Sequence, residues 1–255
     1  MSLEIAVIPC LRDNYAFLLH DRATGATAVV DTPEVGPINA ALEARGWHLT
    51  HILNTHHHPD HVGGNRMLCD THGCQIIGPA SDAHRIPGLH EGVGEGDAVM
   101  LGQIQAVVWD TPAHTSGHIS YYFAEASALF VGDTLFAVGC GRLFEGTALQ
   151  MWSAMHRYRS LPDHTRVYCA HEYTASNIRF ARSIDPSNEA LARRAQEVEQ
   201  LRAADQFTVP TTIAQEKATN PFMRADDPML AAAVQRSGAS PADVLGEIRR
   251  RKDRF

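Results

Sequence analysis

The stretch THHHPDH (55–61) sets four histidines and one aspartate within seven positions, directly after the apolar run HILN (51–54). Imidazole and carboxylate groups are the common ligands of transition metals in proteins. A solvated histidine-rich turn is the alternative interpretation. The strand-like run on one side and the pair Gly63-Gly64 on the other favour a folded site. The stretch therefore predicts a metal-binding loop at the end of a strand.

The spacing H-x-H-x-D-H divides the ligands of this loop into two groups. In an extended loop, alternate positions point the same way, so His56 and His58 can reach one ion. The chain then turns into a helix and aims Asp60 and His61 at a second position. We expect two adjacent ions, which need more ligands than one loop supplies.

Three further candidates each lie at or shortly after the end of a predicted strand: His114 in TPAHTSGH, Asp133 in FVGDTLF and His171 in YCAHEYT. A single histidine after a strand is more often an ordinary surface or core residue. Their common placement favours a site, because an α/β sheet gathers its functional loops along one edge.

The first two thirds of the chain alternate short apolar runs with helical patterns, which predicts a layered α/β protein. The predicted strands cover residues 27–31, 51–54, 104–110, 119–123, 128–133 and 166–170. The predicted helices cover residues 36–46, ending at Gly46, and 148–161, beginning after Thr147.

The strand signal fades near residue 174, where Ala/Arg/Glu/Gln-rich helical periodicity begins. The stretches DDPMLAAAVQRSG and SPADVLGEIRRRKD each begin with a capping Asp or Ser before a Pro at the first helical position. We therefore expect two domains, 1–173 with the metal ligands and 174–255 built of helices.

Charge is unevenly distributed over the 255 residues, whose formal net charge is −7. Residues 1–172 hold 9 Arg/Lys and 18 Asp/Glu, a net −9, whereas residues 173–255 hold 13 and 11, a net +2. An acidic body argues against nucleic-acid binding, and a small cationic part suits one anionic ligand.

The five cysteines form an odd set without C-x-x-C, which predicts free thiols rather than a disulfide framework. The chain has no run of ~18 apolar residues, and its first residues lack a signal-peptide pattern. We expect a cytoplasmic monomer that does not bind a membrane.

Together, the H-x-H-x-D-H run, TPAHTSGH, GDTLF and HEYT resemble the metallo-β-lactamase superfamily. The chain also resembles glyoxalase II, the hydroxyacylglutathione hydrolases. The resemblance lies in the stretches GDTLFAVGCGRLFEGT, HEYTASNIRFA and NPFMR, and in PCLRDNYAFLL and RRRKDRF near the two ends. The first motif alone is specific only to the superfamily, whereas the combination covers essentially the whole chain. The resemblance implies an αββα sandwich with a C-terminal α-helical domain.

The resemblance also implies seven metal ligands, three for each ion and one for both: His56, His58 and His114; Asp60, His61 and His171; and Asp133. Asp133, Asp60 and His61 would also serve catalysis. Asp31 resembles an outer residue that orients ligands, although simple loop capping explains it equally well. Zinc is the expected ion, and iron or manganese would suit the same ligands.

Two close cations that share a water lower its pKa from 15.7 toward about 7, which supplies hydroxide at neutral pH. The resemblance implies that this hydroxide attacks the thioester of S-D-lactoylglutathione and releases D-lactate and glutathione, a step of methylglyoxal detoxification. A thiol with a pKa near ~8.5 leaves as thiolate, so no dedicated acid is needed.

Glutathione conjugates are anionic and need cations besides the metals. By resemblance, Arg249 and Lys252 would bind the glycyl carboxylate, and Arg142, Tyr173 and Asn177 would contact the peptide part. The alternative for RRRKDR is a solvated helix end, where cations also suit the helix dipole.

One residue departs from the family pattern. Phe144 stands where many members have Tyr, so one hydroxyl contact with the substrate, worth roughly 0.5–1.5 kcal/mol, would be missing.

Three alternatives share parts of the pattern. Nucleases of the same superfamily should show a basic groove, which the acidic body disfavours. Sulfur dioxygenases that act on glutathione persulfide resemble the chain more closely, but they use similar ligands around one iron, whereas seven ligands favour two metals. A metal-storing protein without catalysis would not need Asp133 and the substrate-side residues.

Overall fold

The computed structural model describes residues 3–255, and the chain divides into two compact units. Unit 1 comprises the chain up to Asp110 together with Ser116–Gly132, and unit 2 comprises Thr111–Thr115 and Asp133–Phe255. All five cysteines are free thiols, as the sequence predicts. Within residues 3–255, no helix has the length and apolar character needed to cross a membrane.

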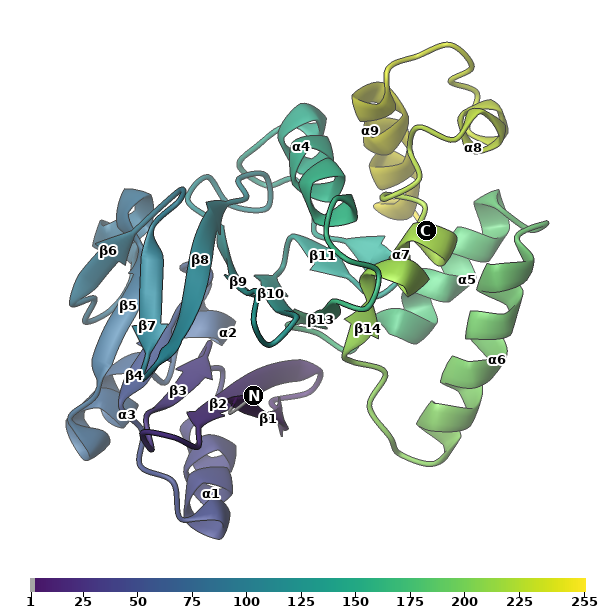
Figure 1. Ribbon diagram of the computed structural model, residues 1–255. Coiled ribbons are helices and arrows are strands. Elements are labelled where there is room, and N and C mark those ends of the chain that lie inside the picture. Colours follow the sequence, from purple (N-terminus) through teal and green to yellow (C-terminus); the bar gives the residue numbers. More distant parts are fainter. Residues whose placement is uncertain (1–2) are drawn as a thin grey trace. The chain divides into compact units, whose positions relative to one another are not determined.

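The first sheet of unit 1 has six strands in chain order, antiparallel from β1 to β3 and parallel from β3 to β6 (Figure 1). These strands are β1 (Leu3–Cys10), β2 (Asn14–Asp21), β3 (Thr27–Val30), β4 (His51–Leu53), β5 (Gln75–Pro79) and β6 (Glu91–Val93). The parallel strands are connected by α1 (Val35–Arg45), α2 (Pro59–Val62), α3 (Asn65–His72) and the 3₁₀-helix η1 (Ala80–Arg85). Parallel strands need such helical crossovers, so this half of the sheet is the α/β pattern that the sequence predicts.

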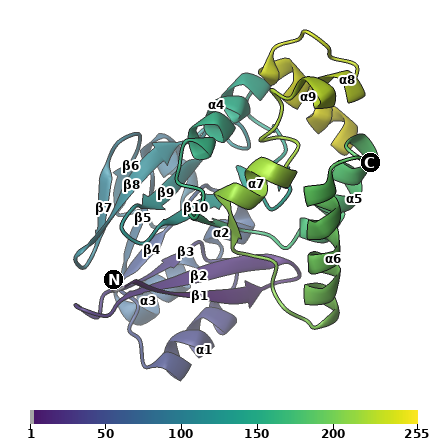
Figure 2. The same ribbon diagram turned by 45° about the vertical axis from the view of Figure 1, so that its right-hand side comes forward.

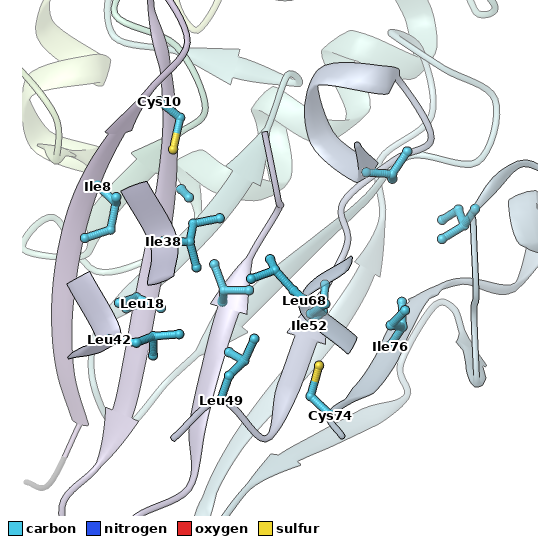
Figure 3. Packing of buried hydrophobic residues seen from close by; sticks show 14 residues of the cluster. Ile8, Cys10, Leu18, Ile38, Leu42, Leu49, Ile52, Leu68, Cys74 and Ile76 are labelled. Atoms are coloured by element: carbon cyan, nitrogen blue, oxygen red, sulfur yellow. The ribbon is translucent and has the colours of Figure 1, made fainter. Parts of the chain in front are cut away.

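An apolar core joins α1 and α3 to this sheet (Figure 3). Ile38 and Leu42 of α1 and Leu68 of α3 are buried with Ile52 of β4 and Ile76 of β5. Burying a side chain of this size contributes roughly 1.5–3 kcal/mol. The loop that follows β4 therefore starts from a firmly held strand.

The second sheet of unit 1 is an antiparallel run in the order β10-β9-β8-β7. Its strands are β7 (Ala98–Leu101), β8 (Ile104–Asp110), β9 (Ile119–Phe123) and β10 (Ala128–Gly132). The rings of Phe17 on β2 and Phe130 on β10 have centroids 5.6 Å apart, and the Tyr121 hydroxyl donates to the carbonyl of Asn54 (2.9 Å). The two sheets therefore pack against each other as a sandwich.

Unit 2 is mainly helical. Its short strands are β11 (Leu135–Phe136), β12 (Gly139–Cys140), β13 (Arg166–Cys169) and β14 (Thr211–Thr212). Its helices are α4 (Ala148–Arg159), α5 (Thr174–Ile184), α6 (Glu189–Ala203), α7 (Ile213–Thr219), α8 (Pro228–Ala233) and α9 (Pro241–Lys252). Helices α5 and α6 lie side by side, and α4 packs on α9 (Figure 2).

Several predicted elements are confirmed, together with the residues that were predicted to begin them. Strands β8 and β9 have the predicted bounds, and Thr147 caps α4 in a capping box with Gln150. Asp227 and Ser240 cap α8 and α9, as the Asp-Pro and Ser-Pro pairs predict. Strands β1 and β2 could not be predicted from the sequence, because the turn between them has no Gly or Pro. Leu11 adopts a positive φ of 50° there.

Candidate metal centre

The loop after β4 carries four candidate ligands within unit 1. His56 and His61 are fully buried, and His58 and Asp60 are half-buried. His56 Nε2 and His58 Nδ1 lie 3.1 Å apart. Pro59 begins α2 and turns the chain, and Asp60 Oδ2 then lies 3.6 Å from His61 Nε2. The loop thus presents two pairs of donor atoms.

The separations within these pairs fit a metal site. Two ligand atoms about 2.0–2.1 Å from one tetrahedral ion lie about 3.3 Å from each other. The 3.1 Å between His56 and His58 and the 3.6 Å between Asp60 and His61 bracket that value. The donor set, imidazole with carboxylate, suits a divalent transition metal.

Asp31 lies behind the loop, directly after β3, and its backbone has a positive φ of 56°. One carboxylate oxygen accepts from the backbone N–H of Thr55 (2.8 Å). The other accepts from the Thr55 hydroxyl (2.8 Å) and from Nδ1 of His61 (2.9 Å). A buried carboxylate with three donors explains why the left-handed backbone is held at this position.

These hydrogen bonds fix the tautomers of two histidines. Since a carboxylate only accepts, His61 carries its proton on Nδ1, and the lone pair of the ring is on Nε2. The Thr55 hydroxyl gives its own proton to Asp31, so it accepts from Nδ1 of His56 (3.0 Å). Nε2 of His56 therefore carries the lone pair as well. Asp31 thus prepares both rings to bind a metal through Nε2.

Three further side chains support the loop. Asn14 donates from Nδ2 to Oδ2 of Asp60 (3.1 Å). The His118 ring stacks on His56 with centroids 4.8 Å apart. His57 bonds through Nδ1 to Asp82 (3.2 Å), so its ring is engaged outside the two donor pairs.

Unit 2 brings together the other three candidate ligands, all of which are buried. Nε2 of His114 lies 3.4 Å from Oδ2 of Asp133, and Nε2 of His171 lies 3.5 Å from Oδ1 of the same carboxylate. Each imidazole therefore faces a different oxygen of Asp133. Both separations are close to the ~3.3 Å expected for ligands that share an ion, so the carboxylate has the geometry of a bridge between two metals.

The two imidazoles of unit 2 are held in place by their neighbours. Nδ1 of His114 donates to the carbonyl of Arg142 (3.0 Å), which puts the lone pair on Nε2. His171 stacks on Tyr173, with centroids 4.7 Å apart and an interplanar angle of 5°. The Phe136 and His171 rings also pack in a T-shaped arrangement, with their centroids 5.7 Å apart.

Two of the candidate substrate cations lie at the end of α9. Arg249 is buried, donates from Nη1 to the carbonyl of Cys140 (2.8 Å) and pairs with Asp253 (2.9 Å). Lys252 lies over the ring of Phe180, 5.3 Å from its centroid. Burial, and then the positive charge of Arg249, lower the pKa of Lys252 to about 8.

The remaining candidate substrate residues differ in exposure. The Arg142 side chain is 64% exposed and its Nε lies 3.7 Å from Asp253. Phe144 is 59% exposed, with its ring centroid 5.2 Å from that of His114, and Tyr173 is half-buried. Asn177 is buried and donates from Nδ2 to the carbonyl of Ala137 (3.0 Å), so its amide nitrogen faces the chain rather than a ligand.

Several residues near the candidate ligands could not be predicted from a sequence pattern. Asn14 and Thr55 act directly on ligands, whereas Glu216 and Asn220 bond to the segment after Asp133. Asn14 and Asn220 lie within the quoted stretches PCLRDNYAFLL and NPFMR, which are the only signals for them. Thr55 lies within the quoted stretch THHHPDH, whereas Glu216 lies in none of the quoted stretches.

Two family models match the chain. The model described as Metallo-beta-lactamase superfamily matches residues 12–171, and the one described as Hydroxyacylglutathione hydrolase C-terminus matches residues 172–255. A hydroxyacylglutathione hydrolase from Rhodospirillum rubrum is 54% identical and aligns over 100% of this chain and 99% of its own length. One from Methylococcus capsulatus is 52% identical, with 99% of each chain aligned.

The crystal structure of ETHE1 from Myxococcus xanthus superposes with a TM-score of 0.65 at 25% sequence identity, covering 97% of this chain and 100% of that chain. The expected sandwich of mixed sheets with a helical C-terminal region is confirmed by these matches.

Proposed function

Because the chain belongs to the hydroxyacylglutathione hydrolases of the metallo-beta-lactamase superfamily, we propose that it hydrolyses S-D-lactoylglutathione to D-lactate and glutathione. Membership of this family makes the chain a metal-dependent hydrolase. The observation that carries the proposal is the identity of 52% and 54% over the full length of relatives with this name. This sequence identity extends over both the segment with the candidate metal ligands and the helical segment.

The proposed centre holds two divalent metal ions, with three ligands for each and one shared ligand: His56, His58 and His114; Asp60, His61 and His171; and Asp133. The two donor pairs of the loop after β4, and the separate imidazole at each oxygen of Asp133, support this assignment. When bound, the two ions activate a water for attack and polarise the thioester carbonyl. Zinc is the proposed ion, and iron or manganese takes the same donors.

The chain's own residues prepare this chemistry. Asp31 keeps the protons of His56 and His61 on Nδ1, so that both rings are ready to bind before a metal arrives. The burial of His56, His61 and Asp133 excludes bulk water, which strengthens electrostatic interactions at the centre. Glutathione leaves as a thiolate, and an ordinary thiol pKa near ~8.5 makes a proton donor unnecessary.

Unit 2 supplies the cations that select an anionic thioester. Lys252, whose ammonium lies over the Phe180 ring 5.3 Å from its centroid, is the proposed contact for a glutathione carboxylate. Arg249, on the same helix, supports this contact. Arg142 and Tyr173 contact the peptide part. Phe144 offers an apolar surface beside His114 where a hydroxyl contact is absent.

The proposed domains are residues 1–173 for metal binding and residues 174–255 for glutathione binding. The adjoining matches of the two family models support this division. We place the enzyme in the cytoplasm as a monomer that acts on a small molecule.

The test is turnover of S-D-lactoylglutathione by purified, zinc-loaded enzyme, followed as loss of thioester absorbance. We expect hydrolysis that a chelator abolishes and added zinc restores. The proposal fails if the metal-replete enzyme does not hydrolyse the thioester. It also fails if that enzyme instead consumes oxygen with glutathione persulfide or cleaves RNA.

A further inference from the structure

A short hairpin in unit 2 follows the shared carboxylate directly. Strands β11 and β12 pair antiparallel to form this hairpin, Leu135–Cys140. Asp133 lies two residues before it and Arg142 two residues after it. The two ends are tied together, because the backbone N–H of Gly141 donates to the carbonyl of Thr134 (3.2 Å). Any shift of the hairpin therefore moves the backbone on both sides of it.

The ends of the hairpin contact the functional side chains. The carbonyl of Arg142 accepts from Nδ1 of His114 and so orients that ring (3.0 Å). A Cβ on Gly141 would collide with the carbonyl oxygen of Asp133, so only glycine allows this close approach. The carbonyl of Cys140 accepts from Arg249 (2.8 Å). The hairpin thus links a bridging ligand, a histidine ligand and a substrate cation.

The tip of the hairpin is held by a buried carboxylate on α7. Val138 has a positive φ of 59°, and its backbone N–H donates to Oε2 of Glu216 (2.9 Å). Glu216 also accepts from Nδ2 of Asn220 (2.8 Å) and from the hydroxyl of Thr211 (2.7 Å). Burial raises the pKa of Glu216, and these donors oppose the rise. The left-handed turn at Val138 depends on this acceptor.

Two asparagines satisfy the carbonyls of the same turn. Nδ2 of Asn220 donates to the carbonyls of Phe136 (3.2 Å) and Gly139 (2.9 Å). Nδ2 of Asn177 donates to the carbonyl of Ala137 (3.0 Å). A hairpin with two residues in each strand has little stability of its own. Its position is therefore set by these side chains rather than by its own ladder.

We propose that Glu216 and Asn220 are positioning residues that set the place of Asp133 and the orientation of His114 through the hairpin. The inference rests on the metal centre of the proposed function. Neither side chain belongs to the proposed metal ligands or to the proposed substrate contacts. They act on the proposed centre through the backbone of the hairpin, whose position they fix.

The test measures zinc affinity by competition with a chromogenic chelator, using the full-length chain. We expect Glu216→Ala to weaken zinc binding about tenfold, because the hairpin loses one buried hydrogen bond, the one that Val138 donates. Glu216→Gln should keep wild-type affinity, since its amide oxygen can accept from Val138 while its NH₂ donates to the Thr211 oxygen. Asn220→Ala should weaken zinc binding to a similar extent as Glu216→Ala.

The control is Leu230→Ala, which removes a buried apolar side chain of α8. It should lower the melting temperature without changing zinc affinity. If Glu216→Ala does not fold, Thr211→Val provides a milder change, because it removes one donor to the same carboxylate and should weaken zinc binding in the same direction.

The inference is overturned if folded Glu216→Ala, or folded Thr211→Val where Glu216→Ala does not fold, binds zinc as tightly as the wild type. Equal weakening by Glu216→Gln and Glu216→Ala would also overturn it. Since the readout needs no substrate, a wild type that binds zinc but does not hydrolyse the thioester would reject the proposed function alone.

Discussion

The two sets of candidate ligands are built in different ways. In unit 1, all four ligands come from one loop of seven residues, and Asp31 behind it orients two imidazoles. In unit 2, His114, Asp133 and His171 come from three separate segments, and they meet around one carboxylate. The first set is secured by local chain geometry and the second by contacts between distant parts of the sequence. Unit 2 also carries the proposed substrate cations, so damage to it should affect affinity as well as rate.

The largest effect should come from Asp133→Asn. The amide offers one oxygen and no charge, so the proposed shared ligand of the second set is lost. We expect kcat/KM to fall at least about 100-fold, because changes even in the outer shell of a metal site cost 10- to 100-fold. Steady-state kinetics with metal analysis measures this. Asp226→Asn, at an exposed carboxylate of unit 2, is the matched control and should leave kcat/KM unchanged.

A smaller effect should come from Asp31→Asn in unit 1. An amide that donates to Nδ1 of His61 would move the ring proton to Nε2, the nitrogen proposed to bind the metal. We expect kcat to fall about 10- to 100-fold with little change in KM, because the proposed substrate cations lie in unit 2. A rise in KM with kcat unchanged would contradict the role given to Asp31.

The smallest effect should be the pH dependence of substrate binding in unit 2. The pKa of Lys252 is lowered to about 8 by burial and by the charge of Arg249. The ammonium is charged below that pH and neutral above it, so KM should rise several-fold between about pH 7 and 9 while kcat changes less. Lys252→Arg should flatten the profile, since arginine stays charged. A wild-type KM that is constant over this range would exclude Lys252 as the carboxylate contact.

The difference between the two ligand sets also explains how much of the site could be predicted from the sequence. The loop ligands stand at fixed spacing after an apolar run, so their two pairs could be predicted from the positions alone. His114, Asp133 and His171 could be identified only because each lies at or shortly after the end of a predicted strand, and by resemblance to a known family. The strands β8, β9 and β10 behind two of them could be predicted, because their apolar runs end in clear turn signals.

The positioning contacts could not be predicted. Glu216 bonds to Val138 across 78 positions, and Asn220 to Gly139 across 81. No local pattern marks a buried glutamate on a short helix as an acceptor for a distant backbone N–H. The role of Thr55 is hidden for a similar reason, because its hydroxyl acts between Asp31 and His56 only once the strands β3 and β4 are paired.

We propose that the two sets of ligands together hold two metal ions. Its most direct test is elemental analysis of the zinc-saturated wild type after removal of unbound metal. We expect two zinc ions per chain. One ion or none per chain would contradict it.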